Sequence, residues 1–157
     1  MDKRALIQHN LATSQQILKR CLGDVTEAEA STLPEGILAP VVWQVGHLAF
    51  VDKHFIERAG ATTATKLPER YATLFKTGTG GAADYPPLSE ALRAFDDTHE
   101  ALVRVVAEAD LEAPNEGTGR IWNNIGEMFS FADVHRWYHI GKINTLRALL
   151  GKPRLFG

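Results

Sequence analysis

Disulfide bonds, membrane spans and charge of one dominant sign are all missing from this sequence. A single cysteine, Cys21, has no partner for an intrachain bridge. The 17 Lys and Arg against 19 Asp and Glu give a formal net charge of −2, so the basic surface that nucleic-acid binding requires is lacking. No apolar run reaches membrane-spanning length, and the stretch MDKRALIQHNLATSQQ lacks the apolar core of a signal peptide. We therefore expect a cytoplasmic protein that binds neither nucleic acid nor a membrane.

What is present is the composition of an ordinary globular protein. A chain of 157 residues, 45% of them hydrophobic, can bury a core without disulfides. We predict a single domain over residues 1–157. Cys21 shares an apolar stripe with Leu11 and Leu18, which favours core packing over a catalytic thiol.

Hydrophobic periodicity predicts four long helices and no strand. In each segment apolar residues recur three and four positions apart, as one buried helix face requires. Gly23 follows the first segment, Gly151 and Pro153 follow the last, and Ser89 is expected to cap the third. The predicted helices span 2–22, 41–59, 89–109 and 124–150, so we predict an all-α four-helix bundle.

A long connection, residues 60–87, separates the second and third predicted helices. It is rich in Gly, Ala, Thr and Pro and has no sustained period. A connection of this length can carry the chain back so that the flanking helices run parallel. We consider two roles for its stretch from Thr62 to Pro86, which includes Tyr71 and Phe75: a lid over a pocket, or an inert surface loop, which is the simpler interpretation. A short helical turn is expected around Glu27.

Two histidines four residues apart lie on the apolar face of the last predicted helix. His135 and His139 continue an inward series that includes Phe131. Residues four apart rise about 6 Å and project from one face, so both imidazoles can reach one ion at about 2 Å from each nitrogen. Hydrogen-bonded core histidines are the alternative, and the spacing alone does not separate the two. Arg136 and Trp137 follow His135, so the HExxH motif of metalloproteases is absent.

The second predicted helix supplies the preferred third ligand. It is apolar nearly all round, with a narrow polar edge through Gly46, Lys53 and Glu57, so it is expected to be packed on most sides. His47 lies in its most apolar part. His54 follows seven residues later, about 10.5 Å along the axis, and is expected at the surface.

The remaining histidines are weaker candidates. His9 lies on the polar side of the first predicted helix and is expected to be solvated. In segment 89–109 the buried stripe can pass through either Thr98 or His99, so His99 stays a reserve ligand.

Polar and aromatic neighbours of these histidines are further candidates. Gln44, one turn before His47, and Tyr138, one turn after His135, are candidates to orient a ligand or to contact a substrate. Ordinary interior packing is the alternative for both. Trp43 and Phe131 are expected to form wall and core.

Two segments, APVVWQVGHLAFVDKHF and ADVHRWYHIGKINTLRALLGKP, resemble the paired motifs of the DinB family of metal-dependent four-helix bundles. The resemblance spans essentially the whole chain in helix order, although only these segments are specific. It implies that one histidine of the second helix and two of the fourth bind a divalent metal, and these match His47, His135 and His139. It also implies an up-down-down-up topology and a homodimer. Zinc, nickel and iron all suit imidazole ligands.

A second resemblance concerns a domain within larger enzymes. WQVGHLAF and ERYATLFKTG are similar to segments of the DinB-like domain of ergothioneine-forming sulfoxide synthases, where three such histidines hold iron. That activity needs a second large domain, so we do not expect it here. Lys142 is a departure from the family pattern, because relatives commonly have Gln after the HxG step.

The resemblance also implies a class of chemistry. Three neutral ligands leave an open coordination position, which is typical of a catalytic metal. Relatives include transferases and isomerases that use low-molecular-weight thiols such as bacillithiol, mycothiol or glutathione. We therefore expect a metal-dependent enzyme, such as a thiol-dependent transferase or isomerase or a hydrolase, that acts on a small molecule. A non-catalytic metal-binding or stress-associated interaction domain is the alternative, because no obvious acid or base lies beside the histidines.

Overall fold

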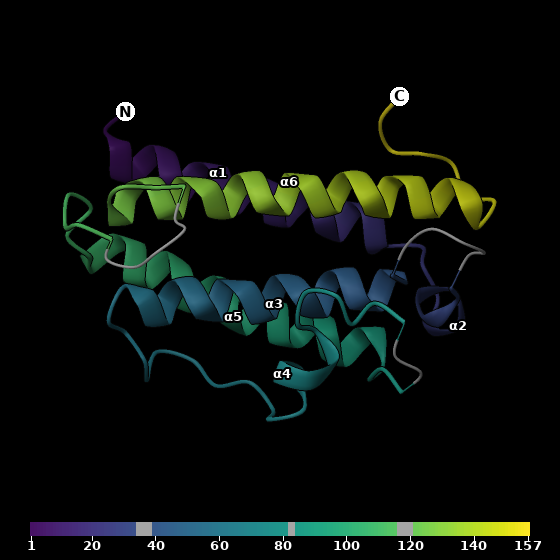
Figure 1. Ribbon diagram of the computed structural model, residues 1–157. Helices are drawn as coiled ribbons and strands as arrows, with labels where there is room; N and C mark the ends of the chain where they lie inside the picture. Colours follow the sequence, from purple (N-terminus) through teal and green to yellow (C-terminus); the bar gives the residue numbers. More distant parts are fainter. Residues whose placement is uncertain (34–38, 82–83, 116–120) are drawn as a thin grey trace.

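The computed structural model describes residues 1–33, 39–81, 84–115 and 121–157 (Figure 1). Across these residues the only strand-like pairing is an isolated bridge between Pro114 and Asn124. The prediction of an all-α protein is therefore confirmed for the described residues, and the four long helices begin and end within one residue of their predicted bounds. The helices are α1 (Lys3–Leu22), α2 (Glu27–Ser31), α3 (Val41–Arg58), α4 (Tyr71–Leu74), α5 (Leu88–Glu108) and α6 (Ile125–Leu149).

The four long helices pack as two neighbouring pairs. α3 packs most extensively against α5, and α1 packs against α6. Figure 1 shows α1 and α6 on one side of the molecule and α3 and α5 on the other. Apolar side chains fill the interior in two clusters, one that includes Leu48 and Phe95 and one that includes Phe55 and Phe129. α3 also contacts α6, which brings together the two helices that carry the candidate ligands.

α3 is buried on nearly every side, as its apolar sequence predicts. Gly46 departs from the prediction, because it is buried and not part of a polar edge. The ring of Phe75 lies on it so closely that a Cβ at Gly46 would come within 2.3 Å of the ring. The absence of a side chain at Gly46 therefore lets the chain after α4 pack directly on α3.

Residues 60–87 contain a short helix, α4, that the periodicity did not predict. Tyr71 in α4 and the following Phe75 are only 1% and 0% exposed, and their ring centroids lie 4.7 Å apart. Both belong to the apolar cluster that includes Leu48. The connection is thus fixed to α3 by buried aromatic rings, so Tyr71 and Phe75 are core residues here, and a role of the connection as a lid stays a prediction.

A carboxylate from α2 caps the start of α5. Ser89 was the predicted cap, but α5 begins at Leu88 and Ser89 lies within its first turn. The carboxylate of Glu27 accepts hydrogen bonds from the backbone N–H groups of Leu88 and Ser89. A negative charge at this position satisfies unpaired N–H groups and interacts favourably with the helix dipole. The expected helical turn around Glu27 therefore has a structural role in fixing where α5 begins.

Two further expectations can be compared with the described residues. None of their helices has both the length and the apolarity needed to cross a membrane. Cys21 is fully buried, and burial raises the pKa of its thiol, so the prediction of core packing is confirmed.

Candidate functional site

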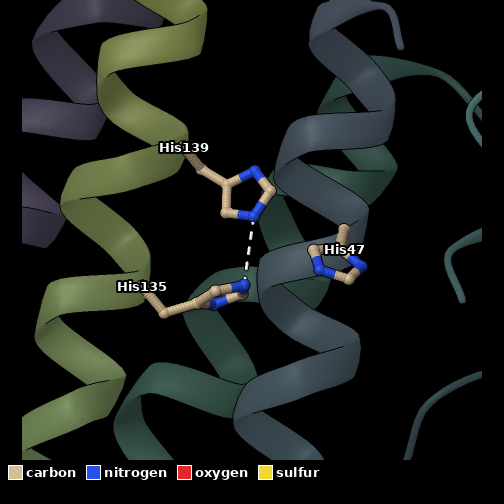
Figure 2. A group of neighbouring side chains, drawn as sticks. All are labelled: His47, His135 and His139. Carbon is tan, nitrogen blue, oxygen red and sulfur yellow. Dashed lines mark hydrogen bonds between the residues drawn. The ribbon is translucent and has the colours of Figure 1, made fainter. Parts of the chain in front are cut away.

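Three imidazoles from two helices converge in the interior between α3 and α6. His47 comes from α3, and His135 and His139 come from α6; Figure 2 shows the three rings facing one another across the gap between these helices. Each offers one nitrogen, and these three atoms all lie within 4.8 Å of one another. His47 and His139 are only 5% and 2% exposed, while His135 is half-buried. We call these three residues the histidine cluster.

Neutral acceptors orient two of the three rings. His47 donates a hydrogen bond from Nδ1 to the backbone carbonyl of Phe75 at 2.7 Å. His139 donates from Nδ1 to the Oε1 atom of Gln44 at 2.6 Å, and the Nε2 of Gln44 in turn donates to the carbonyl of Ala39. Because each Nδ1 carries the proton, the lone pair of each ring lies on Nε2.

His135 is the ring whose tautomer is free to change. Its Nε2 lies 3.1 Å from Nε2 of His139, the contact drawn as a dashed line in Figure 2. The His139 nitrogen accepts here, so His135 Nε2 is the donor. The Nδ1 of His135 is buried and has no hydrogen-bond partner. A shift of the His135 proton to Nδ1 would therefore leave Nε2 of all three rings unprotonated.

The protein keeps the three imidazoles neutral at physiological pH. Burial, together with the charges of neighbouring groups, lowers the pKa of His139 to about 2 and that of His135 to about 4. Burial also lowers the pKa of His47. A metal ion binds imidazole only in its neutral form, so these residues are already in the protonation state that coordination needs.

An aromatic wall encloses the α3 side of the cluster. The indole of Trp43 stacks on the His47 ring with centroids 4.5 Å apart and planes inclined by 10°. Trp43 Nε1 donates a hydrogen bond of 3.2 Å to the hydroxyl of Thr79. Thr79 and Phe75 both belong to the connection between α3 and α5, so this connection holds both the wall and one ring in place.

The polar and aromatic residues predicted to lie beside the histidines differ in burial and in their contacts with the cluster. Gln44 lies within the site, as its bond to His139 shows. Tyr138 is 58% exposed, and its ring makes a T-shaped contact with that of His139, with centroids 5.1 Å apart. Phe131 is half-buried and stacks on His135 at 6.3 Å.

The other histidines lie outside the cluster. His9 and His54 are exposed, as predicted. His99 is 7% exposed, but its Nδ1 accepts a hydrogen bond of 3.0 Å from Arg136 rather than facing the three rings. His99 therefore contacts Arg136 and does not belong to the histidine cluster.

Two features next to the cluster were missed by the sequence reading. The carbonyl of Phe75 is a backbone group, and nothing in the sequence marks it as the partner of His47. Arg136 was treated only as a residue that breaks the HExxH motif, yet it is fully buried next to His135 and forms an ion pair with buried Asp52. The sequence did contain a signal of this burial, because Arg136 lies on the same helical face as Ala132 and Ile140.

The chemistry of this donor set fits a divalent metal ion. It provides three neutral imidazoles, two of them fixed by hydrogen bonds at the nitrogen remote from the centre. Such outer contacts set the tautomer and direction of metal-binding histidines. Ligand atoms that converge in this way are consistent with a centre completed by an ion.

Comparisons with known proteins place these features in a family. A family model described as DinB superfamily matches residues 10–143, which includes all three histidines of the cluster. Searches of curated proteins and of solved structures found no match.

Proposed function

This chain belongs to the DinB superfamily, and from that premise we propose that His47, His135 and His139 bind one divalent metal ion, either zinc, nickel or iron. The observation that carries the proposal is the approach of the three ligand atoms to within 4.8 Å of one another. The hydrogen bonds from His47 to Phe75 and from His139 to Gln44 support it further, because they direct Nε2 inward.

We propose that the protein is a metal-dependent enzyme that acts on a small molecule, as a thiol-dependent transferase or isomerase. A metal held by three neutral ligands supplies Lewis acidity at an open position, where it favours the deprotonated form of a thiol or water. The chain contributes the surroundings. Gln44 and the Phe75 carbonyl fix the imidazoles, and the stacked indole of Trp43 excludes water from one side.

A non-catalytic metal-binding domain is the second candidate. One observation favours it: the described residues place no free carboxylate in hydrogen-bond contact with the three histidines, and the buried acid Asp52 is paired with Arg136. In that case the ion serves to join α3 to α6. The two candidates share the metal and differ only in turnover.

Metal analysis of variants tests the shared part of the proposal. Protein purified without an affinity tag is expected to contain one metal per chain, and His139→Ala or His47→Ala is expected to abolish it. His54→Ala is the matched control, because His54 lies on α3 but is exposed. Undiminished metal in the His139→Ala protein would contradict the assignment.

Turnover separates the enzyme from the binding domain. The metal-loaded protein is tested with low-molecular-weight thiols and model electrophiles, and consumption of an electrophile is expected to disappear in His47→Ala. Electrophile consumption no faster than in the metal-free protein, together with independent binding of thiol and metal, would favour the non-catalytic domain.

We also propose an up-down-down-up bundle topology and a homodimer. The direction of the colour gradient along α1, α3, α5 and α6 in Figure 1 supports the topology. Exposed apolar side chains on α1 and α6, among them Leu6, Val134 and Leu149, support an interface between two copies. Light scattering at micromolar concentration is expected to give the mass of a dimer, and a monomer mass would reject that assignment.

A further inference from the structure

The charge around the histidine cluster is positive before any metal is added. The Nδ1 partner of His47 is a backbone carbonyl and that of His139 is an amide oxygen, and neither carries a charge. Two cationic side chains lie near the imidazoles: Arg136, which follows His135 directly, and Lys142, whose ammonium lies over the ring of Tyr138, which packs against His139. Arg136 is neutralised by its ion pair with Asp52, so Lys142 is the uncompensated charge of the two.

The position of Lys142 on α6 explains its reach. It follows His139 by three residues and His135 by seven, and these separations place the three residues on one face of a helix. Its ammonium lies over the ring of Tyr138, with Nζ 4.3 Å from the ring centroid. That ring makes a T-shaped contact with His139. Lys142 is half-buried, so its charge is held beside the cluster rather than extended into solvent.

The cluster is least buried at His135. His135 is half-buried, in contrast to His47 and His139, and Tyr138, which packs against His139, is exposed. The solvent-facing side of the cluster is therefore the α6 side, on which Lys142 lies. A cation at the entrance of a partly desolvated site favours negatively charged ligands and disfavours positively charged ones.

We propose that Lys142 is a specificity-determining residue whose ammonium group binds the anionic group of the small molecule that completes the metal centre. This inference rests on the proposed metal binding by the histidine cluster. Three neutral ligands leave the charge of a divalent ion uncompensated, and Lys142 adds one further positive charge. A small anion with a donor atom for the metal, such as a thiolate or a carboxylate, is the ligand class that offsets this charge. A neutral ligand of equal size gains nothing from Lys142.

Ligand titrations of the cobalt-loaded protein test this inference. Cobalt(II) reports ligand binding through its visible spectrum, and the probes are thiocyanate, which is an anion, and imidazole, which is neutral. Lys142→Gln is expected to weaken thiocyanate binding about tenfold, which corresponds to 1.4 kcal/mol, and to leave imidazole binding within about twofold of the original. Lys142→Arg keeps the charge and is expected to retain most of the thiocyanate affinity.

A control variant completes the test, and its possible results distinguish failure of this inference from failure of the proposed metal site. Lys19→Gln changes the net charge equally at a site on α1, where Lys19 pairs with Asp96, and is expected to leave both titrations unchanged. If Lys142→Gln weakens both probes equally, or neither, the inference is overturned while the metal site stands. If the original protein binds no cobalt, the proposed function is overturned and this inference with it.

Discussion

Arg136 and Asp52 form an ion pair in the centre of the protein, with 2.6 Å between Nη2 and Oδ2 and side-chain exposures of 1% and 0%. Arg136 also donates to the carbonyl of Leu11 in α1 and to Nδ1 of His99 in α5. One side chain of α6 therefore bonds to all three of the other long helices, one residue away from His135. Burial raises the pKa of the Asp52 carboxyl, and the adjacent guanidinium opposes that effect.

We predict that Arg136→Met destabilises the fold by about 3 to 5 kcal/mol, because it leaves the carboxylate of Asp52 buried without a partner. Urea unfolding of the metal-free protein measures the change. The double variant Arg136→Met with Asp52→Leu is expected to recover much of the loss, since a buried pair replaced by apolar side chains is often neutral.

The matched control for this prediction is Arg104→Met. Arg104 lies on the surface of α5 and is 3.9 Å from Glu100, with both side chains more than half exposed. This substitution is expected to cause no measurable change. A double variant that is no more stable than Arg136→Met would show that the unpaired carboxylate is not the cause of the loss.

Gln44 is predicted to control metal affinity more than stability. Gln44→Met keeps the size of the side chain but removes the acceptor for Nδ1 of His139. Loss of such an outer contact typically lowers metal affinity about 10- to 100-fold. Competition with a chromophoric chelator measures the affinity. Gln15→Met is the control, because Gln15 bonds to Asp96 away from the cluster, and an equal loss in both variants would contradict the role of Gln44.

The helices were predictable because the sequence features that define a helix lie within the helical segment itself. A period of 3.6 residues, together with Gly and Pro at the ends, is read within one segment at a time, and it placed every long helix to within one residue. The cap of α5 was not predictable in this way. Glu27 is far from Leu88 along the chain, and only the folded structure brings its carboxylate to that helix start.

The histidine cluster was predictable in part. Spacing put His135 and His139 on one face, but the centre of the buried face runs through Ala132, Arg136 and Ile140. The predicted inward series ran through Phe131, His135 and His139 and did not include Arg136, because arginine is rarely buried. Because the buried face of α6 is centred on Arg136, His135 lies at its edge, where a ligand can reach it.

Gly46→Ala is predicted to disturb the fold and the site together. The new Cβ would overlap the ring of buried Phe75, whose backbone carbonyl accepts the hydrogen bond from His47. We expect a loss of about 1 to 3 kcal/mol in urea unfolding, as for other overpacked cores, and weaker metal binding. Gly141→Ala on α6 is the matched control, because a Cβ there meets nothing within 4 Å. That variant is expected to gain stability by up to about 1 kcal/mol, since alanine favours helix.

His99 is predicted to make stability depend on pH between about 6.5 and 4. Its pKa is lowered from 6.5 to about 4, chiefly by burial and also by the charges of Arg136 and Lys19, while Asp96 partly opposes them. The unfolded chain therefore binds a proton at His99 at a higher pH than the folded protein does. Stability from this residue is fully present above pH 6.5 and is lost as the pH falls towards 4, by about 3 kcal/mol in total.

Unfolding of His99→Gln across this pH range measures that contribution. Glutamine keeps an acceptor for the hydrogen bond from Arg136 but cannot be protonated, so the difference in stability between the two proteins is expected to change with pH by about 3 kcal/mol. His9→Gln, at an exposed position of α1, serves as the control and is expected to run parallel to the original protein. If the curve for His99→Gln also runs parallel to that of the original protein, the buried neutral state of His99 is not what links folding to pH. The fall in stability then comes from other groups, and the contact between His99 and Arg136 carries no proton linkage.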